Sequence, residues 1–351
     1  MKRIKTAIVG YGGMGQWHGE KLLTLDDKIE AAGTYDILET RQDAAKKAGF
    51  TPYPSFEAVL ADPELELVTI ATPNDLHKPL AIELMAAGKN VISEKPVTLC
   101  LADLDEMIGA AEKYGKLFTV HQNRRWDEDF LVCKKIIDDD MLGNAFRIES
   151  RVQGSRGIPG DWRNKKEFGG GMVLDWGVHL LDQMVMLKPD KAITSVYAEL
   201  TYITNEGVDD GCFITLTFED GFKALVEVGT SNFIRLPRWY VTGENGSAIV
   251  ENWNLDGKIT MVSDWEKRDA VPVATAAGLT KTMAPRTAET IKEYPLPKVE
   301  SDVRDFYRNV YDVIRNGAQP LITHRQVRRV MKIMEAAFKS SETNSVVEEI
   351  I

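Results

Sequence analysis

A chain of 351 residues, 44% hydrophobic and 27% charged, has the composition of an ordinary globular protein and the length of two domains. Its net charge of −10 argues against a nucleic-acid-binding surface, and no apolar run approaches the ~20 residues that span a bilayer. Three widely separated cysteines indicate free thiols rather than disulfides, and the N-terminal residues leave no room for a signal peptide, so we expect a cytoplasmic protein.

The first predicted element is an apolar strand over residues 4–10, which runs directly into a glycine-rich turn and a helix over residues 13–24. In the G-x-G-x-x-G spacing of this turn, the first glycine permits a tight turn, the second lets the backbone approach a pyrophosphate, and the third lets the helix pack closely on the strand. The helix N-terminus adds unpaired N–H groups and a positive dipole end. We therefore expect the following residues to contact a dinucleotide: Gly10, Gly12, Gly13, Met14 and Gly15.

Asp36 supports a dinucleotide site, because it ends a second apolar run 21 positions after Gly15. A carboxylate about 20 residues beyond the turn accepts a hydrogen bond from a ribose hydroxyl and repels the 2′-phosphate of NADP. Ile37 offers no cation for that phosphate, although Arg41 in the next turn could swing over. We therefore expect NAD, with NADP as the alternative, and we expect Ile37 to lie beside the cofactor.

Strand and helix patterns alternate over the first ~120 residues, which is typical of a doubly wound parallel sheet. Ligands bind such sheets at the carboxyl ends of the strands. Glycines at 49, 88 and 115 mark expected helix ends. The predicted strands are residues 4–10, 29–35, 66–71, 90–93 and 117–121, and the predicted helices are residues 13–24, 39–47, 56–60, 76–86 and 101–114.

The pattern changes after residue 121 to strands that follow one another without intervening helices. Asp220-Gly221 and Asn245-Gly246 are hairpin signals between such strands, and residues 212–218 alternate to give one apolar face. This predicts an open, largely antiparallel sheet backed by helices. The predicted strands are residues 145–152, 193–203, 212–218, 223–228, 239–241 and 248–251, and the predicted helices are residues 127–137, 171–187, 302–315 and 325–340.

Residues 264–298 are polar, contain four prolines and lack clear periodicity. We predict a long loop there, which could cap the active site or contact a neighbouring subunit.

The segment Ala71-Thr72-Pro73-Asn74 ends the third predicted strand, and His77 lies near the start of the next helix. Asn74 or Asp75 could simply cap that helix. The same loop would also lie against the cofactor riboses at the edge of the crevice, and the two roles can coexist. We expect Thr72, Asn74 and His77 to contact the cofactor.

Glu94-Lys95-Pro96 ends the fourth predicted strand. A lysine beside a glutamate is often only a solvated ion pair, but a lysine held in a crevice can exchange a proton with a reacting oxygen. Glu94 could orient a ribose hydroxyl or tune Lys95, and the Lys95–Pro96 bond is a candidate for the cis form.

Asn123, Arg124 and Arg125 follow the fifth predicted strand and join the two halves of the chain. Hinge packing would explain these residues without any function. The functional interpretation places Asn123 near the nicotinamide and the arginines around the substrate crevice.

Asp175 and His179 follow three consecutive glycines, Gly169-Gly170-Gly171, and are four residues apart on a predicted helix, so they would share one face. A histidine on such a helix is often only a hydrogen-bonded core residue. Together, however, Asp175 could bind a sugar hydroxyl while neutral His179 takes a hydroxyl proton as hydride leaves the carbon. One histidine and one aspartate make a thin ligand set for zinc, so we expect no metal.

These motifs resemble, in content and order, those of the glucose–fructose oxidoreductase, inositol dehydrogenase and MocA (Gfo/Idh/MocA) family of nicotinamide-dependent sugar and cyclitol oxidoreductases. The resemblance covers essentially the whole chain and implies an α/β protein. A Rossmann domain is expected over residues 1–122 and an α+β substrate-binding and oligomerisation domain over residues 123–351, with the C-terminal helices packed back on the first domain.

The resemblance assigns the catalytic lysine to Lys95, which would also contact cofactor and substrate, the substrate-binding acid to Asp175, and the catalytic histidine to His179. Trp162 and Arg163 look like the family's tryptophan-arginine pair near the cofactor. Arg124 is expected to bind substrate, within a segment similar to a subgroup that includes scyllo-inositol dehydrogenases.

The implied reaction is hydride transfer between NAD(P) and a ring carbinol of a sugar or cyclitol, by a homodimer or homotetramer that assembles through the second sheet. Two alternatives stay open from the sequence. One is a glycoside hydrolase that uses NAD for transient oxidation and elimination, and the other is a dinucleotide-binding regulator without turnover.

Overall fold

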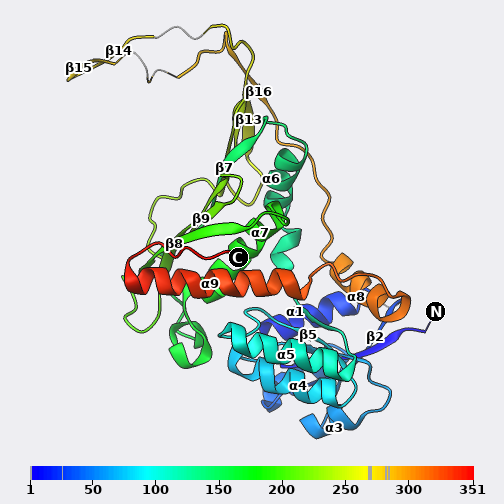
Figure 1. The fold of residues 1–351 in the computed structure, drawn as a ribbon. Helices are drawn as coiled ribbons and strands as arrows, with labels where there is room; N and C mark the ends of the chain where they lie inside the picture. The colour runs from blue at the N-terminus through cyan, green and yellow to red at the C-terminus, as the bar shows by residue number, and fades with distance from the viewer. Residues whose placement is uncertain (1, 26, 268–270, 281–282, 284) are drawn as a thin grey trace.

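The computed structural model describes residues 2–25, 27–267, 271–280, 283 and 285–351. Two large β-sheets organise these residues, one of six strands and one of eight, and a two-stranded hairpin stands apart from both (Figure 1). The fold is α/β, as predicted. None of the helices in the described ranges is long and apolar enough to cross a membrane.

The six-stranded sheet has the order β3-β2-β1-β4-β5-β6, and all its neighbouring pairs are parallel. The strand order reverses between β1 and β4, which is where a doubly wound sheet binds its ligand. The short strand β3 was not predicted. The elements are β1 (Ile4–Val9), α1 (Gly13–Leu22), β2 (Ile29–Tyr35), α2 (Glu39–Lys47), β3 (Thr51–Pro52), α3 (Phe56–Ala61), β4 (Leu67–Ile70), α4 (His77–Ala86), β5 (Asn90–Ser93), α5 (Leu101–Tyr114) and β6 (Phe118–Val120).

The eight-stranded sheet has the order β16-β13-β12-β11-β7-β10-β9-β8 and is antiparallel except for the pair β7–β10. The predicted open, mostly antiparallel sheet is therefore confirmed. Its strands are β7 (Ala145–Gln153), β8 (Ile193–Thr201), β9 (Gly211–Phe218), β10 (Lys223–Gly229), β11 (Trp239–Gly243), β12 (Gly246–Val250), β13 (Gly257–Val262) and β16 (Ile291–Tyr294).

The prediction of one long loop over residues 264–298 was wrong for part of that segment. It contains β14 (Val273–Thr275), β15 (Gly278–Thr280) and β16, while residues 268–270, 281–282 and 284 lie outside the described ones. Most side chains of these strands are exposed, so no apolar alternation could reveal them. In Figure 1 the β14–β15 hairpin lies far from the first domain, so it does not cover the strand ends there.

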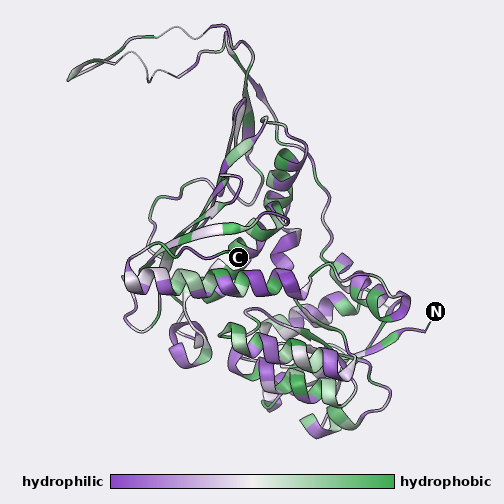
Figure 2. Cartoon of the chain, in the orientation of Figure 1, coloured by the Kyte–Doolittle hydropathy of each residue, from purple (hydrophilic) through white to green (hydrophobic). Residues whose placement is uncertain are grey.

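One face of the eight-stranded sheet is buried under helices. Along β9, residues Cys212, Ile214 and Leu216 are fully buried, whereas the intervening Phe213 is 43% exposed. Contacts to this sheet come from α6 (Glu128–Asp138), α7 (Val178–Leu187) and α9 (His324–Thr343). Figure 2 shows the corresponding mixture of hydrophilic and hydrophobic residues along these helices.

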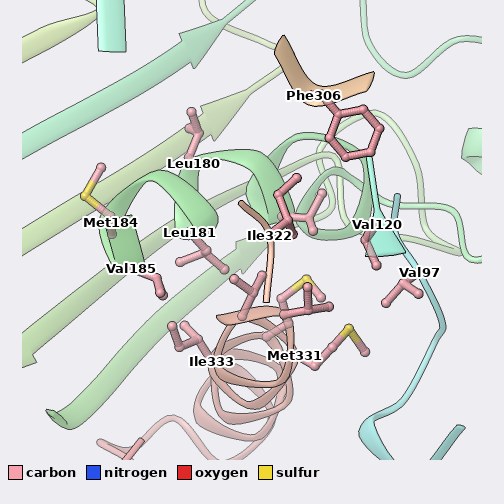
Figure 3. Packing of buried hydrophobic residues seen from close by; sticks show 14 of the residues in the cluster. Val97, Val120, Leu180, Leu181, Met184, Val185, Phe306, Ile322, Met331 and Ile333 are labelled. Carbon is pink, nitrogen blue, oxygen red and sulfur yellow. The ribbon is translucent and has the colours of Figure 1, made fainter. Parts of the chain in front are cut away.

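The hydrophobic core is continuous between the two halves of the chain. Figure 3 shows Leu181 and Val185 of α7 facing Ile333 of α9, with Val97 and Val120 of the first domain close by. The C-terminal helices contact both halves of the chain. On α8 (Arg304–Asn316), Arg315 forms two 2.7 Å contacts with Glu66, and Ser340 Oγ of α9 accepts the Ala198 N–H of β8 at 2.9 Å.

A buried ion pair also holds the segment after β6, which connects the two halves, against α7. Arg125 Nε and Nη2 donate to the two carboxylate oxygens of Asp182 at 2.7 and 2.6 Å, and both side chains are at most 3% exposed. Removing one partner of such a pair leaves an uncompensated buried charge.

We expect Arg125→Met to lower the free energy of unfolding by about 3–5 kcal/mol, because Asp182 would stay buried without its cation. Urea unfolding checks this value. The control is Arg328→Gln, which removes an exposed bidentate partner of Asp105 and should cost about 1 kcal/mol or less. Equal losses in the two variants would contradict this assignment.

Candidate active site

The glycine turn at the end of β1 has no room for side chains at two positions. Gly10 has a φ of +89°, and a Cβ there would lie 2.5 Å from the Ala71 carbonyl oxygen. A Cβ on Gly15 would lie 2.0 Å from the Gly10 carbonyl oxygen. These are the predicted tight turn and close helix packing. Helix α1 begins at Gly13 without a side-chain cap, so its first N–H groups are available to an anion.

A pocket of 290 Å³ opens beside the turn and is lined by Asp36, Ile37, Arg41 and Thr72, among others. Asp36 is 4% exposed. Its Oδ2 accepts the Tyr11 N–H at 2.7 Å, and its Oδ1 accepts the Leu38 N–H at 2.9 Å. Arg41 Nη1 lies 3.3 Å from Asp36 Oδ2, and the arginine side chain is 45% exposed. The pocket therefore presents a fixed carboxylate with a movable cation beside it.

Asn74 and His77 both form hydrogen bonds to backbone carbonyl groups of the protein. Asn74 caps no helix, and its Nδ2 instead donates to the Phe168 carbonyl at 3.1 Å, across to the second half of the chain. His77 is fully buried, with Nδ1 3.0 Å from the Pro96 carbonyl and Nε2 3.1 Å from the Thr72 carbonyl. The buried His77 ring therefore connects the backbones of two loops, the one at Thr72 and the one at Pro96.

Lys95 meets Asp175 at the junction of the two halves. Lys95 Nζ donates to the Asp175 carbonyl oxygen at 2.9 Å and lies 3.4 Å from its Oδ1. Arg163 Nε donates to Asp175 Oδ2 at 3.0 Å, and Arg163 Nη1 also pairs with Asp161. The Arg163 guanidinium stacks on Trp162, with 4.6 Å between its carbon and the ring centroid. The contacts of the Trp162–Arg163 pair are thus directed at Asp175. The Lys95–Pro96 bond is cis, as predicted.

His179 lies beside this ion cluster and is 4% exposed. Burial, followed by the positive charges of Lys95 and Arg124, lowers the pKa of His179 well below its usual value of 6.5. Its Nδ1 is buried without a hydrogen-bond partner among the described residues. A neutral imidazole with an unused nitrogen is suited to proton exchange with a ligand.

The predicted continuous helix over residues 171–187 is interrupted. Val173–Gly177 forms a π-helical turn, and α7 starts only at Val178. Asp209 accepts the Val173 N–H through Oδ2 at 2.8 Å, and its carbonyl accepts the Met172 N–H at 3.0 Å. Burial raises the pKa of Asp209 to about 6, against the opposing effect of these N–H groups. Asp209 holds the turn that carries Asp175, and no sequence motif singled it out.

Glu94 points into the protein, away from the position expected for a ribose contact. Its Oε1 accepts from His18 Nε2 at 2.9 Å and from His121 Nδ1 at 2.8 Å, and its Oε2 accepts the Lys95 N–H at 3.0 Å. Tyr307 Oη lies 2.7 Å from His18 Nδ1. Burial alone would raise the pKa of Glu94, but His121 and His18 hold it well below its usual range. Hydrogen bonds account for the three potential metal-ligand atoms of this cluster.

The two arginines after β6 have different environments. Arg124 stacks over Trp176 at 4.8 Å and lines a pocket of 570 Å³ together with Asn123 and Met14. Arg125 faces Asp182 in the interior, so it does not line the crevice as expected. Asn123 Oδ1 is buried without a partner among the described residues, which leaves it available to a ligand.

Comparison with known proteins agrees with this geometry. Residues 4–122 match the model of an oxidoreductase family with an NAD-binding Rossmann fold, and residues 130–249 match a GFO/IDH/MocA C-terminal domain. The chain belongs to the Gfo/Idh/MocA family. This Gfo/Idh/MocA protein is therefore an NAD(P)-dependent oxidoreductase with an NAD-binding Rossmann domain.

Relatives of this Gfo/Idh/MocA oxidoreductase match it along nearly their whole length. The scyllo-inositol 2-dehydrogenase (NADP(+)) of Bacillus subtilis is 29% identical over 97% of this chain and 94% of its own. An uncharacterized oxidoreductase of Schizosaccharomyces pombe is 31% identical over 99% of this chain and all of its own. The crystal structure of an NAD-binding protein from Listeria innocua is 46% identical, with a TM-score of 0.95, over 99% of this chain and all of its own.

Replacing Glu94 by Gln should lower the free energy of unfolding by about 1.5–3 kcal/mol, because the buried carboxylate accepts three N–H groups. Urea unfolding of the isolated protein measures this loss. Glu335→Gln is the matched control, since Glu335 Oε1 accepts one N–H, that of Leu101, at the surface. An unchanged midpoint for Glu94→Gln would show that the buried cluster does not support the loop.

Proposed function

We propose that this oxidoreductase transfers hydride between NAD(P) and a ring carbinol carbon of a sugar or cyclitol. The observation that carries the proposal is the meeting of Lys95, Asp175 and neutral His179 at one point between the two halves of the chain. A relative named as a scyllo-inositol dehydrogenase, and others named as D-apiose and myo-inositol dehydrogenases, support the substrate class.

The residues around the first sheet fit a dinucleotide. The strand end at Gly10 has no space for a Cβ, and the uncapped start of α1 offers free N–H groups to a pyrophosphate. The carboxylate and apolar wall of the 290 Å³ pocket suit an adenosine. The residues that would hold the cofactor are Gly10, Gly12, Gly13, Met14, Gly15, Asp36, Ile37, Thr72 and Asn123.

When bound, NAD(P) supplies or accepts the hydride. The protein's own part is proton exchange and positioning of the substrate. Asp175 would accept a hydrogen bond from a ring hydroxyl, and Lys95 would hold the reacting oxygen through its positive charge. His179, neutral because it is buried beside two cations, would take the hydroxyl proton during oxidation and return it during reduction.

We propose NAD rather than NADP as the preferred cofactor. Asp36 is fixed by two backbone N–H groups, and its charge would repel a 2′-phosphate. Arg41 already pairs with this carboxylate. The NADP-dependent relative is the reason to measure both cofactors.

We also propose a cytoplasmic homodimer or homotetramer. Three free cysteines fit a reducing compartment. On the face of the second sheet opposite the buried side of β9, Phe213 is exposed beside the largely buried ion pair of Arg151 and Glu227, and such a face suits contact with a second copy. Size-exclusion chromatography with light scattering tests the assembly.

The proposed function is tested by absorbance at 340 nm with NAD and NADP, each against inositols, aldoses and simple glucosides. Growth of absorbance with a free sugar or inositol supports the dehydrogenase. No change in absorbance with any substrate, together with release of free sugar from the glucosides, would indicate the NAD-dependent glycoside hydrolase. Cofactor binding without either reaction would indicate a regulator.

Lys95→Ala and His179→Ala should each lower kcat at least 100-fold, because each removes a group that exchanges or stabilises a proton. Cofactor affinity, followed by fluorescence titration, should change little. Lys332→Ala, which removes a partly exposed lysine 3.6 Å from Glu349, serves as the surface control. Turnover at the wild-type level in both site variants would refute these roles.

The pH profile of alcohol oxidation should have its acid limb below pH 6.5. Because burial and two cations lower the pKa of His179, the base stays unprotonated as the pH falls through 6.5. Removing one cation with Arg124→Gln should move this limb toward 6.5. A wild-type limb at or above pH 6.5 in kcat/KM would argue against His179 as the base.

A further inference from the structure

A second-domain pocket of 730 Å³ includes Asp175 in its wall and extends away from it between two loops. Its volume lies within the roughly 300–1,000 Å³ of small-molecule sites. One loop follows β7 and carries Arg156, and the other follows β10 and carries Arg235. Since Asp175 also contacts Lys95, this pocket begins at the proposed point of reaction.

Backbone hydrogen bonds hold the two loops together. The Gly157 N–H donates to the Thr230 carbonyl at 3.0 Å, and the Asn232 N–H donates to the Gly154 carbonyl at 2.8 Å. The Leu236 N–H also donates to Gln153 Oε1 at 2.7 Å. The two arginines are therefore carried by loops that are hydrogen-bonded to each other.

The charge of this pocket is unbalanced. Its wall contains three arginines and one carboxylate, that of Asp175. Arg163 pairs with Asp175 and Asp161, but Arg156 and Arg235 form no ion pair or side-chain hydrogen bond with any residue in the described ranges. Arg156 and Arg235 are both exposed to solvent, so these two guanidinium groups without a protein partner are free to bind an anion that enters the pocket.

A smaller hollow of 300 Å³ shares Arg156 and Thr230 with this pocket. Its wall includes Ser231, whose Oγ is buried and has no hydrogen-bond partner among the described residues. A buried hydroxyl without a partner beside an arginine adds a second polar group for the oxygen of a ligand.

We propose that Arg156 and Arg235 form a subsite for a carboxylate or phosphate group on the substrate, so that the enzyme acts on anionic sugars or cyclitols. The inference rests on the proposed function, because it places the reacting carbinol at Asp175 and His179. Guanidinium groups bind both oxyanions through paired N–H donors, so the subsite chemistry is the same for a uronate and a sugar phosphate.

The test compares kcat/KM for glucose, glucuronate and glucose 6-phosphate, and for myo-inositol and an inositol monophosphate. We expect at least one anionic member to exceed its neutral counterpart tenfold or more, and 0.5 M NaCl to reduce this preference. The better of the uronate and the phosphate identifies the anion. Calorimetric titration of glucuronate, glucose 6-phosphate and glucose gives the same comparison without turnover.

Arg156→Gln and Arg235→Gln should each lower kcat/KM for the anionic substrate about tenfold more than for its neutral counterpart. Arg325→Gln, an exposed arginine on α9, should change neither. Turnover of neutral rings with no anion preference, or equal losses for both substrates in the arginine variants, would overturn the subsite and leave the proposed function standing. Absence of turnover with every ring substrate, together with no selective binding of the anions, would overturn both.

Discussion

The contact of Lys95 with Asp175 is the interaction on which the rest of the candidate site depends, because its two members come from different halves of the chain. Lys95 follows β5 of the parallel sheet, whereas Asp175 lies in the π-helical turn before α7. The Asp175 side chain is 8% exposed, and a carboxylate so deeply buried is stable as an anion only when cations and N–H donors surround it. Lys95 and Arg163 meet that need. One functional side chain from each half of the chain is therefore held at the same point of the crevice between them.

The buried carboxylate of Glu94 extends this constraint to the C-terminal helices. Glu94 accepts the backbone N–H of Lys95 and is itself stabilised as a carboxylate by hydrogen bonds from His18 and His121. Tyr307 of α8 closes the cluster beside His18. Helix α8, near the end of the chain, thus covers the buried side of the Glu94–Lys95 loop of the first domain. Through Tyr307, His18 and Glu94, the packing of α8 on the Rossmann sheet therefore supports the loop that carries Lys95.

Charge is distributed unevenly over this acidic chain. Around the crevice, Lys95 and Arg124 place positive charge near His179, whose pKa burial already lowers, and Arg163 pairs with Asp175. Such an arrangement keeps the imidazole neutral and favours an oxyanion at the reacting oxygen. The unpaired arginines of the neighbouring pocket continue the same positive surface outward.

The sequence by itself determined the dinucleotide turn, the alternation of strands and helices in the first ~120 residues and the apolar face of β9, because each depends on residues close together in the chain. Gly10 and Gly15 are required by contacts within one turn, and β9 shows its buried face by simple alternation. The roles of His18 and Asp209 became visible only in the tertiary structure. His18 hydrogen-bonds to Glu94, 76 residues away in the sequence, and Asp209 to Val173, 36 residues away. The tertiary structure also showed that Glu94 and His77 point inward, that Arg125 belongs to an ion pair, and that residues 173–177 form a π-helical turn. Residue type and spacing cannot reveal these features, since burial and long-range hydrogen bonds, rather than local periodicity, direct each of those side chains.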